Sequence, residues 1–168
     1  MSDLERIFIA IDDSEASKKA LSYVGRIIGT CRNYEIHVCH ILQPCPTELL
    51  EFPGAEDSKE EERMDAEVVA KQQQWAAEQE KSAEGLLEES RAILLAAGAA
   101  VETVSTHSRM PIDHQGLPAE ILAAASENSC HTIAVGRESF SRFKSLLSKH
   151  VGDELVRKAK GATIWVIE

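Results

Sequence analysis

The stretch from Thr132 to Val151, TIAVGRESFSRFKSLLSKHV, places the strongest constraint on how this chain folds. Its first four residues, Thr132 to Val135, form a short apolar run that is typical of a strand buried on both faces. Gly136 then ends the strand, a polar and basic loop follows, and from about Ser148 a helical pattern runs to Lys160. A strand, a glycine turn, a loop and a helix in this order form the geometry that holds phosphate groups in other proteins, because the first turn of a helix presents free N–H groups.

Predicted strands and helices alternate along the rest of the chain. Apolar runs or apolar–polar alternation predict further strands at 6–11, 35–42, 101–106 and 162–167. Apolar residues at helical spacing predict helices at 16–28, at 58–97, from 117 onward and at 148–160. In the last helix the apolar stripe is Val151, Leu155 and Val156. This order predicts an α/β fold with a doubly wound, five-stranded parallel sheet and helices on both of its faces.

Capping residues mark the starts of two predicted helices. Asp12, Asp13 and Ser14 follow the first strand directly, and Asp and Ser are good helix caps. Asp12 also lies at the carboxyl end of a central strand, where open α/β sheets bind their ligands. Two interpretations of Asp12 therefore stay open, a helix cap and a ligand contact. For the long second helix, Ser58 and Glu61 fit a capping box.

Length and composition indicate one globular domain, residues 1–168. Hydrophobic residues make up 43% of the chain and charged residues 27%, which is ordinary for a soluble protein large enough to bury a core. The sequence has no apolar run of membrane-spanning length, and its first residues show no export signal. We therefore expect a cytoplasmic protein without membrane contact.

The four cysteines, Cys31, Cys39, Cys45 and Cys130, form no C-x-x-C pair, and we expect them to be reduced thiols. His37, Cys39, His40 and Cys45 lie close together in and just after the predicted second strand, which raises the question of zinc. Strand alternation puts His37 and Cys39 on one face and His40 on the other, so we expect no metal site.

The stretch from Thr132 to Val151 resembles the last third of a universal stress protein domain. This is a family of small α/β proteins that often bind ATP. The nucleotide motif of that family is Gly-x-x-Gly, nine residues, and then Gly followed by Ser or Thr. On this chain the first glycine falls on Gly136, the second on Ser139, the third on Lys149 and the hydroxyl residue on His150. One of four motif positions is therefore kept, while the frame around it resembles that of the family.

The first strand carries the resemblance further. Ile11-Asp12-Asp13-Ser14 is similar to the family's Val-Asp-Gly-Ser, and Gly116-Leu117-Pro118 matches a Gly-x-Pro that opens its third helix. The resemblance implies the strand order 3-2-1-4-5, which would bring Asp12 and Gly136 to one crevice. It also implies that Asp12 lies beside the base and ribose of a nucleotide and that Ile41 flanks the adenine. The candidate nucleotide-binding residues are Asp12, Ile41, Val135, Gly136, Arg137, Ser139, Lys149, His150 and Val151.

Three functional classes follow from this resemblance. We favour a regulatory or stress-response protein that uses no cofactor and does not bind ATP in the manner of the family, because Ser139, Lys149 and His150 replace the residues of the phosphate grip. The alternative is weak binding of ATP or AMP, with Arg137, Lys149 and His150 supplying charge in place of backbone amides. An enzyme is not expected, since the chain has no Walker-type lysine loop and no obvious base.

Two surfaces are candidates for protein partners. The net charge is −10, and the stretch from Glu56 to Glu89 holds twelve acidic and four basic residues. It overlaps an acidic helical insertion at about 44–79, longer than the family usually carries, which is either a solvated extension or a partner-binding arm. The last strand has no helix after it and contains Ile164, Trp165 and Val166, which the resemblance assigns to a homodimer contact. The single small basic cluster gives no basis for nucleic-acid binding.

Overall fold

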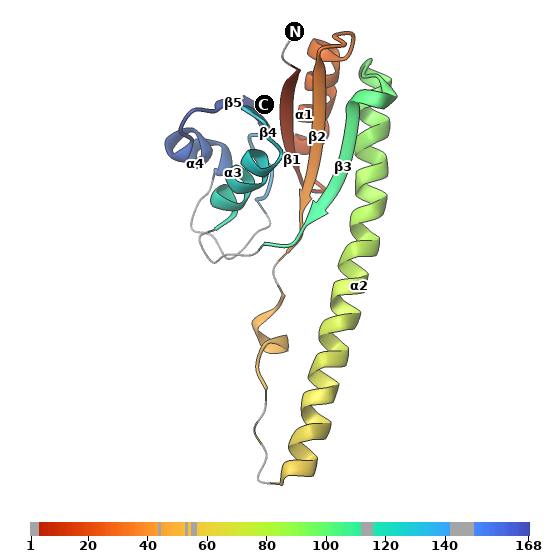
Figure 1. Cartoon of the computed structure of the whole chain (residues 1–168), viewed down its shortest axis with the longest axis vertical. Coiled ribbons are helices and arrows are strands. Elements are labelled where there is room, and N and C mark those ends of the chain that lie inside the picture. The colour runs from red at the N-terminus through yellow and green to blue at the C-terminus, as the bar shows by residue number, and fades with distance from the viewer. Residues whose placement is uncertain (1–3, 44, 53, 55–56, 112–115, 142–149) are drawn as a thin grey trace.

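The computed structural model describes residues 4–43, 45–52, 54, 57–111, 116–141 and 150–168, and all five of the predicted strands lie in one sheet (Figure 1). The sheet is parallel throughout and has the order β3-β2-β1-β4-β5, which confirms the predicted fold and strand order. The strands are β1 (Glu5–Ile11), β2 (Tyr34–Ile41), β3 (Val104–Arg109), β4 (Thr132–Gly136) and β5 (Thr163–Ile167). The helices are α1 (Glu15–Ile28), α2 (Ser58–Ala97), α3 (Leu117–Glu127) and α4 (Val151–Lys158), with short 3₁₀ turns at Thr47–Leu49 and Val101–Thr103.

Two apolar layers hold the helices on the sheet. Successive side chains of a strand point to opposite faces, so β1 serves both layers. Its Ile7 and Ile9 pack into the cluster that includes Leu21 and Val24 of α1. Its Phe8 packs into the cluster that includes residues of α3 and α4 on the other face. The continuous apolar run of β1 is therefore explained by burial on both sides.

Several predicted boundaries need correction. Asp57, and not Ser58, is the N-cap of α2, because its backbone is extended and its carboxylate accepts a hydrogen bond from the Lys59 N–H. Residues Val101–Thr103 form a 3₁₀ turn, so the third strand begins at Val104 and continues to Arg109. This turn is closed by the Thr103 hydroxyl, which donates to the Ala100 carbonyl.

The fourth helix differs from its predicted stripe. Val151 and Leu155 lie one turn apart and are both buried, as the spacing predicts. Val156 is 58% exposed, because the next position on a helix is rotated by about 100° away from that face. The residues 148 and 149 of the predicted helix start lie outside the described residues.

The second helix is far longer than the sheet it packs on, and its first half continues beyond the strands (Figure 1). Its buried residues, Ala83, Ser90 and Leu94, all belong to its second half. Within the described ranges, no helix combines the length and the apolar character that a membrane span requires.

We predict that the protein loses stability as the pH falls from 7 to 5. Burial lowers the pKa of His37, His40 and His107 below the ordinary value of 6.5, so the unfolded chain binds more protons than the folded one in this range. The pKa of Glu127 is lowered from 4.5 by its hydrogen bond to Arg109, and its contribution is lost only at lower pH.

Urea midpoints measured at pH 7, 6 and 5 check this expectation. The His40→Gln variant should show a smaller decrease between pH 7 and pH 5 than the wild type, while a variant of the exposed His131, His131→Gln, should keep the wild-type slope. A midpoint that stays constant over this range would contradict the prediction.

Candidate functional site

A buried polar cluster lies where β1 ends, α1 begins and the chain leaves β4. Its members are Asp12, Ser14, Ser17 and Ser139, and Asp12 and Ser139 are only 5% and 3% exposed. Because β1 and β4 are paired neighbours, their carboxyl ends meet at the point where the strand order reverses. Sequence reasoning predicted this meeting of Asp12 with the Gly136 turn, and the structure confirms it.

Both carboxylate oxygens of Asp12 accept hydrogen bonds within the protein. Oδ1 accepts from the backbone N–H of Ser14 at 3.2 Å, from the Ser14 hydroxyl at 2.5 Å and from the Ser17 hydroxyl at 2.7 Å. Oδ2 accepts from the backbone N–H of Phe140 at 2.6 Å, which lies 128 residues away in the sequence. The N-cap of α1 is Ser14, whose side chain accepts from the Ser17 N–H, so Asp12 supports the cap without being the cap itself.

Ser139 turns its side chain inward, toward α1. Its Oγ lies 2.9 Å from the Ser17 Oγ and 3.5 Å from that of Ser14. The Ser17 proton goes to Asp12, and the Ser17 oxygen already accepts the Asp12 N–H at 3.0 Å. The remaining lone pair of Ser17 therefore accepts the Ser139 proton, and the Ser139 hydroxyl has an internal partner.

Packing is enough to explain why residue 136 is a glycine. A Cβ atom at this position would lie 2.4 Å from the carbonyl oxygen of Ala16 in α1. Only glycine therefore lets the end of β4 approach the start of α1 this closely. Glycine at the predicted first motif position thus has a structural explanation that needs no ligand.

Phe140 connects this polar cluster to the core. It has a left-handed backbone conformation, with φ of 66°, which is uncommon for a bulky residue. Its side chain is 3% exposed and belongs to the same apolar cluster as Ile41, Val135 and Val151. The strained backbone directs the Phe140 N–H to Asp12, while the ring fills the layer between the sheet and α3 and α4.

The predicted nucleotide-binding residues fall into three groups. Six of them are buried: Asp12, Ile41, Val135, Gly136, Ser139 and Val151. Arg137 and His150 are exposed, and Lys149 lies outside the described residues. The Ile41 side chain has 0% exposure, so a base that contacts it requires neighbouring side chains to move.

A surface cleft of about 460 Å³ lies next to this cluster, on the α1 side of the sheet. Its lining residues are Glu15, Ala16, Lys19, Arg137, Glu138, Ile167 and Glu168. Arg137 makes an ion pair with Glu168 across it. Three carboxylates and two cations line the cleft, which makes it a poor site for a polyphosphate.

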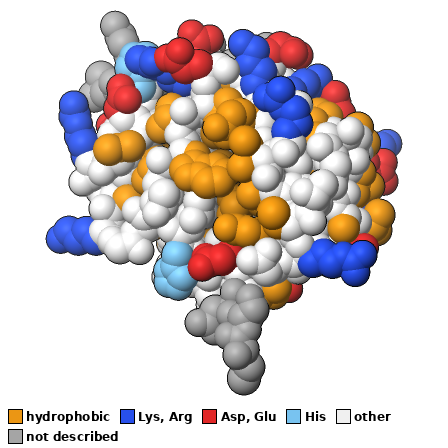
Figure 2. Space-filling model, turned by 90° about the horizontal axis from the view of Figure 1, so that it is seen from above, with side chains coloured by type: hydrophobic (Ala, Val, Ile, Leu, Met, Phe, Trp, Pro, Cys, Tyr) orange, Lys and Arg blue, Asp and Glu red, His pale blue; other side chains and the backbone are white. Residues whose placement is uncertain are grey.

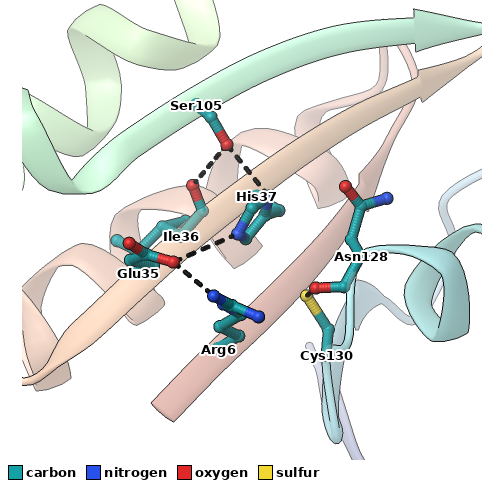
Figure 3. A network of polar contacts seen from close by, with 7 residues as sticks. All are labelled: Arg6, Glu35, Ile36, His37, Ser105, Asn128 and Cys130. Carbon is teal, nitrogen blue, oxygen red and sulfur yellow. Dashed lines mark hydrogen bonds and ion pairs between the residues drawn. The ribbon is translucent and has the colours of Figure 1, made fainter. Parts of the chain in front are cut away.

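A second polar network, on the sheet face opposite α1, was missed by sequence reasoning (Figure 3). Ser105 Oγ lies 3.0 Å from His37 Nδ1, and Arg6 Nε donates to Glu35 Oε2 at 2.9 Å. The register of β2 and β3 pairs His37 with Ser105, and the register of β1 and β2 pairs Arg6 with Glu35. His37 Nε2 lies 3.7 Å from Glu35 Oε2, too far for a hydrogen bond, so the Ser–His–Glu order does not form a catalytic triad.

Metal ligation finds no support in the described part of the chain, where no group of three or more His, Cys, Asp or Glu side chains is placed to hold an ion. All four cysteines are free. Burial raises the pKa of the Cys39 thiol to about 12 and that of the Cys130 thiol to about 11. These two thiols are therefore protonated and unreactive at neutral pH.

Comparison with known proteins places the chain among relatives of the same fold. The model of the universal stress protein family matches residues 4–166. The chain belongs to this family. No curated protein matches it significantly in sequence.

Solved structures of similar fold include three at low sequence identity. The first is the hypothetical protein MJ0577, whose biochemical function was assigned from its structure, with a TM-score of 0.67, 17% identity and coverage of 98% of this chain and 96% of that one. A universal stress protein solved in complex with cAMP has a TM-score of 0.57, 15% identity and coverage of 98% and 96%. The universal stress protein of Archaeoglobus fulgidus in complex with dAMP has a TM-score of 0.52, 17% identity and coverage of 99% of both chains. At these identities the likeness establishes the fold alone.

We predict that Asp12→Ala lowers the free energy of unfolding by about 2–4 kcal/mol, because it leaves buried donors of Ser14, Ser17 and Phe140 without their acceptor. Urea denaturation measures this. The control variant Glu84→Ala, which removes an exposed carboxylate from α2, should change the free energy of unfolding by less than about 0.5 kcal/mol. A loss below about 1 kcal/mol for Asp12→Ala would show that the network adds little to stability.

We also predict that only Cys31 and Cys45 react rapidly with Ellman's reagent in the native protein at pH 8. With pKa values of about 12 and about 11, Cys39 and Cys130 carry a thiolate fraction of only about 10⁻⁴ and 10⁻³ at that pH. All four thiols should react after unfolding in guanidinium chloride. Rapid native labelling of Cys39, detected by peptide mass spectrometry, would be the opposite result.

Proposed function

We propose that this universal stress protein is a regulatory protein that does not bind ATP in the manner of its family, is not an enzyme, and acts as a homodimer. The observation that carries the proposal is the closed polar cluster at the carboxyl ends of β1 and β4. There the Ser139 side chain occupies space that a glycine would leave open, and the Asp12 carboxylate accepts four hydrogen bonds from the protein itself.

Two further features support the loss of the family's phosphate grip. The backbone N–H of Phe140, in the loop where a phosphate would need free amides, already donates to Asp12. The left-handed conformation of Phe140 and the burial of its ring hold that N–H in place. A nucleotide would have to break this hydrogen bond and uncover Ile41, and both changes cost free energy that binding must supply.

The alternative function is the binding of an adenine nucleotide in an altered way. Two universal stress proteins of similar fold were solved with cAMP and with dAMP. In this chain Arg137, Lys149 and His150 would offer side-chain charge to the phosphate instead of backbone amides. Arg137 already pairs with Glu168, so a phosphate at Arg137 must compete with a carboxylate.

Calorimetric titration with Mg-ATP and with AMP tests the proposal. We expect no saturable heat below about 1 mM nucleotide, because the cluster is filled by the protein. The triple variant Ser139→Gly, Lys149→Gly and His150→Ser restores the family's residues and should bind ATP more tightly than the wild type. A micromolar dissociation constant for the wild type would favour the nucleotide-binding alternative, and phosphate release above background would contradict the non-enzymatic assignment.

The proposed homodimer rests on the backbone of β5, which has β4 as its one neighbouring strand in the described sheet. The backbone N–H of Thr163 donates to the backbone carbonyl of His131, just before β4, at 2.8 Å. The backbone carbonyl of Ile167 accepts from the backbone N–H of Arg137, just after β4, at 2.7 Å. Alternate residues of a strand direct their backbone groups to the same side. The backbone N–H and C=O of Ile164 and Val166 therefore point to the outer edge, where a second β5 can pair with them.

Side chains around this edge also favour association. Ile164 and Val166 pack on the α3 and α4 side, whereas Trp165 and Ile167 pack on the α1 and α2 side, and all four are only partly buried. Trp165 therefore leans on the core of its own protomer and leaves part of its surface free. Figure 2 shows the molecule from above, where apolar side chains gather near the middle of the visible face and charged side chains lie around them.

We predict a mass of about twice the 18.5 kDa chain by light scattering. The variant Val166→Pro removes an N–H that points to the edge and leaves the hydrogen bonds to β4 in place, so it should shift the protein toward monomer without unfolding it. Val166→Ala keeps the N–H and should remain dimeric. A wild type that stays monomeric at high concentration would refute the homodimer.

A further inference from the structure

We propose that the first half of α2, together with the segment before it, binds a basic amphipathic helix of a partner protein. We call residues 45–82 the arm and limit every contact below to its described residues, 45–52, 54 and 57–82. This inference goes beyond the proposed function, because it concerns a surface other than the Asp12 cluster and the β5 edge.

The arm projects from the domain. At 1.5 Å per residue, the 40 residues of α2 extend over about 60 Å, whereas the strands beside it have five to eight residues. No residue of α2 before Ala83 is buried. Figure 1 shows that this part of α2 lies beyond the end of the sheet, with the segment that follows β2 beside it.

The two parts of the arm form one surface. The Gln72 side-chain amide donates to the Leu49 carbonyl at 2.5 Å and ties the 3₁₀ turn to the helix. Val68 and Val69 lie one helical turn before Gln72, and Trp75 lies almost one turn after it, so these side chains flank the point of contact. The helix and the preceding segment therefore present a shared face.

The arm carries apolar side chains that are exposed or only partly covered by the protomer. Leu50 is 53% exposed, Phe52 55% and Val69 40%, and Trp75 and Val68 are half-buried. The seven-residue spacing of Val68 and Trp75 places them on one side of the helix, the spacing with which a helix packs against another helix. An apolar helical face of this kind is typical of a docking site for an amphipathic helix.

The negative charge of the arm indicates which kind of partner it can bind. Residues 45–82 contain eleven acidic and four basic side chains. A second arm, an anionic membrane surface and a nucleic acid would all bring like charge to this face, which is unfavourable. A helix with a stripe of Leu, Ile or Val bordered by Lys and Arg matches both the apolar side chains and the carboxylates around them.

Fluorescence anisotropy of a labelled 21-residue peptide, with Leu at the a and d positions of three heptads and Lys elsewhere, tests the proposal on the full chain at 0.15 M salt. We expect saturable binding with a micromolar dissociation constant. A peptide of the same composition with the Leu positions shuffled, and one with Glu in place of Lys, should each bind at least about tenfold more weakly. Equal affinity for the shuffled peptide would reduce the interaction to charge alone and overturn the proposal.

Matched protein variants locate the binding face. The double variant Phe52→Ser, Val69→Ser removes two exposed apolar side chains of the arm and should weaken binding at least about tenfold. Val156→Ser removes an exposed apolar side chain of α4 and should bind as the wild type does. Hydrogen exchange should show slower exchange at 57–82 on adding the peptide, and slowing confined to other segments would contradict the proposal.

Two outcomes separate this inference from the homodimer. Val166→Pro should bind the peptide with wild-type affinity, so a monomeric protein leaves the inference intact. A mass that rises above the dimer with concentration, and returns to it in Phe52→Ser, Val69→Ser, would assign the face to a second copy of this chain and overturn the assignment to a basic partner.

Discussion

The hydrogen bonds of the Asp12 carboxylate are the interaction on which the carboxyl ends of β1 and β4 depend for their structure. They join three segments: the end of β1, the first turn of α1, and the loop after β4, which is reached through the Phe140 N–H. A carboxylate this deeply buried is stable only when its oxygens have partners, and backbone and hydroxyl donors supply them. Because the donors come from segments far apart in sequence, the carboxylate fixes their relative positions as well as its own solvation.

In the proposed function, this closure explains how the sheet of a universal stress protein can be kept while ATP is not bound in the manner of the family. Gly136 is retained because α1 packs against it, and Ser139 takes up the space of the second motif glycine with a hydroxyl bonded to Ser17. The proposed homodimer and the proposed partner use two surfaces instead: the outer backbone groups of β5, and the apolar and acidic arm that includes the first half of α2. The two proposed surfaces belong to different elements of the fold.

Much of the fold could be predicted from the sequence, because buried strands and amphipathic helices leave periodic patterns. The strand order and the meeting of Asp12 with Gly136 were predicted through the family resemblance, and both are confirmed. Local details were harder: Asp57 and Ser58 are both good caps, and only the backbone angles show which of them starts α2. The inward turn of Ser139 and the Ser105–His37 contact depend on partners more than 60 residues away, which no local pattern encodes.

The central claim is that the Phe140 amide belongs to Asp12 and is unavailable to a nucleotide. The most direct measurement is the ¹H–¹⁵N NMR signal of Phe140, followed with and without 5 mM Mg-ATP. The account predicts an amide that exchanges slowly with solvent and keeps its chemical shift when the nucleotide is added. A Phe140 signal that shifts saturably with ATP, or that exchanges as rapidly as an exposed loop amide, would contradict it.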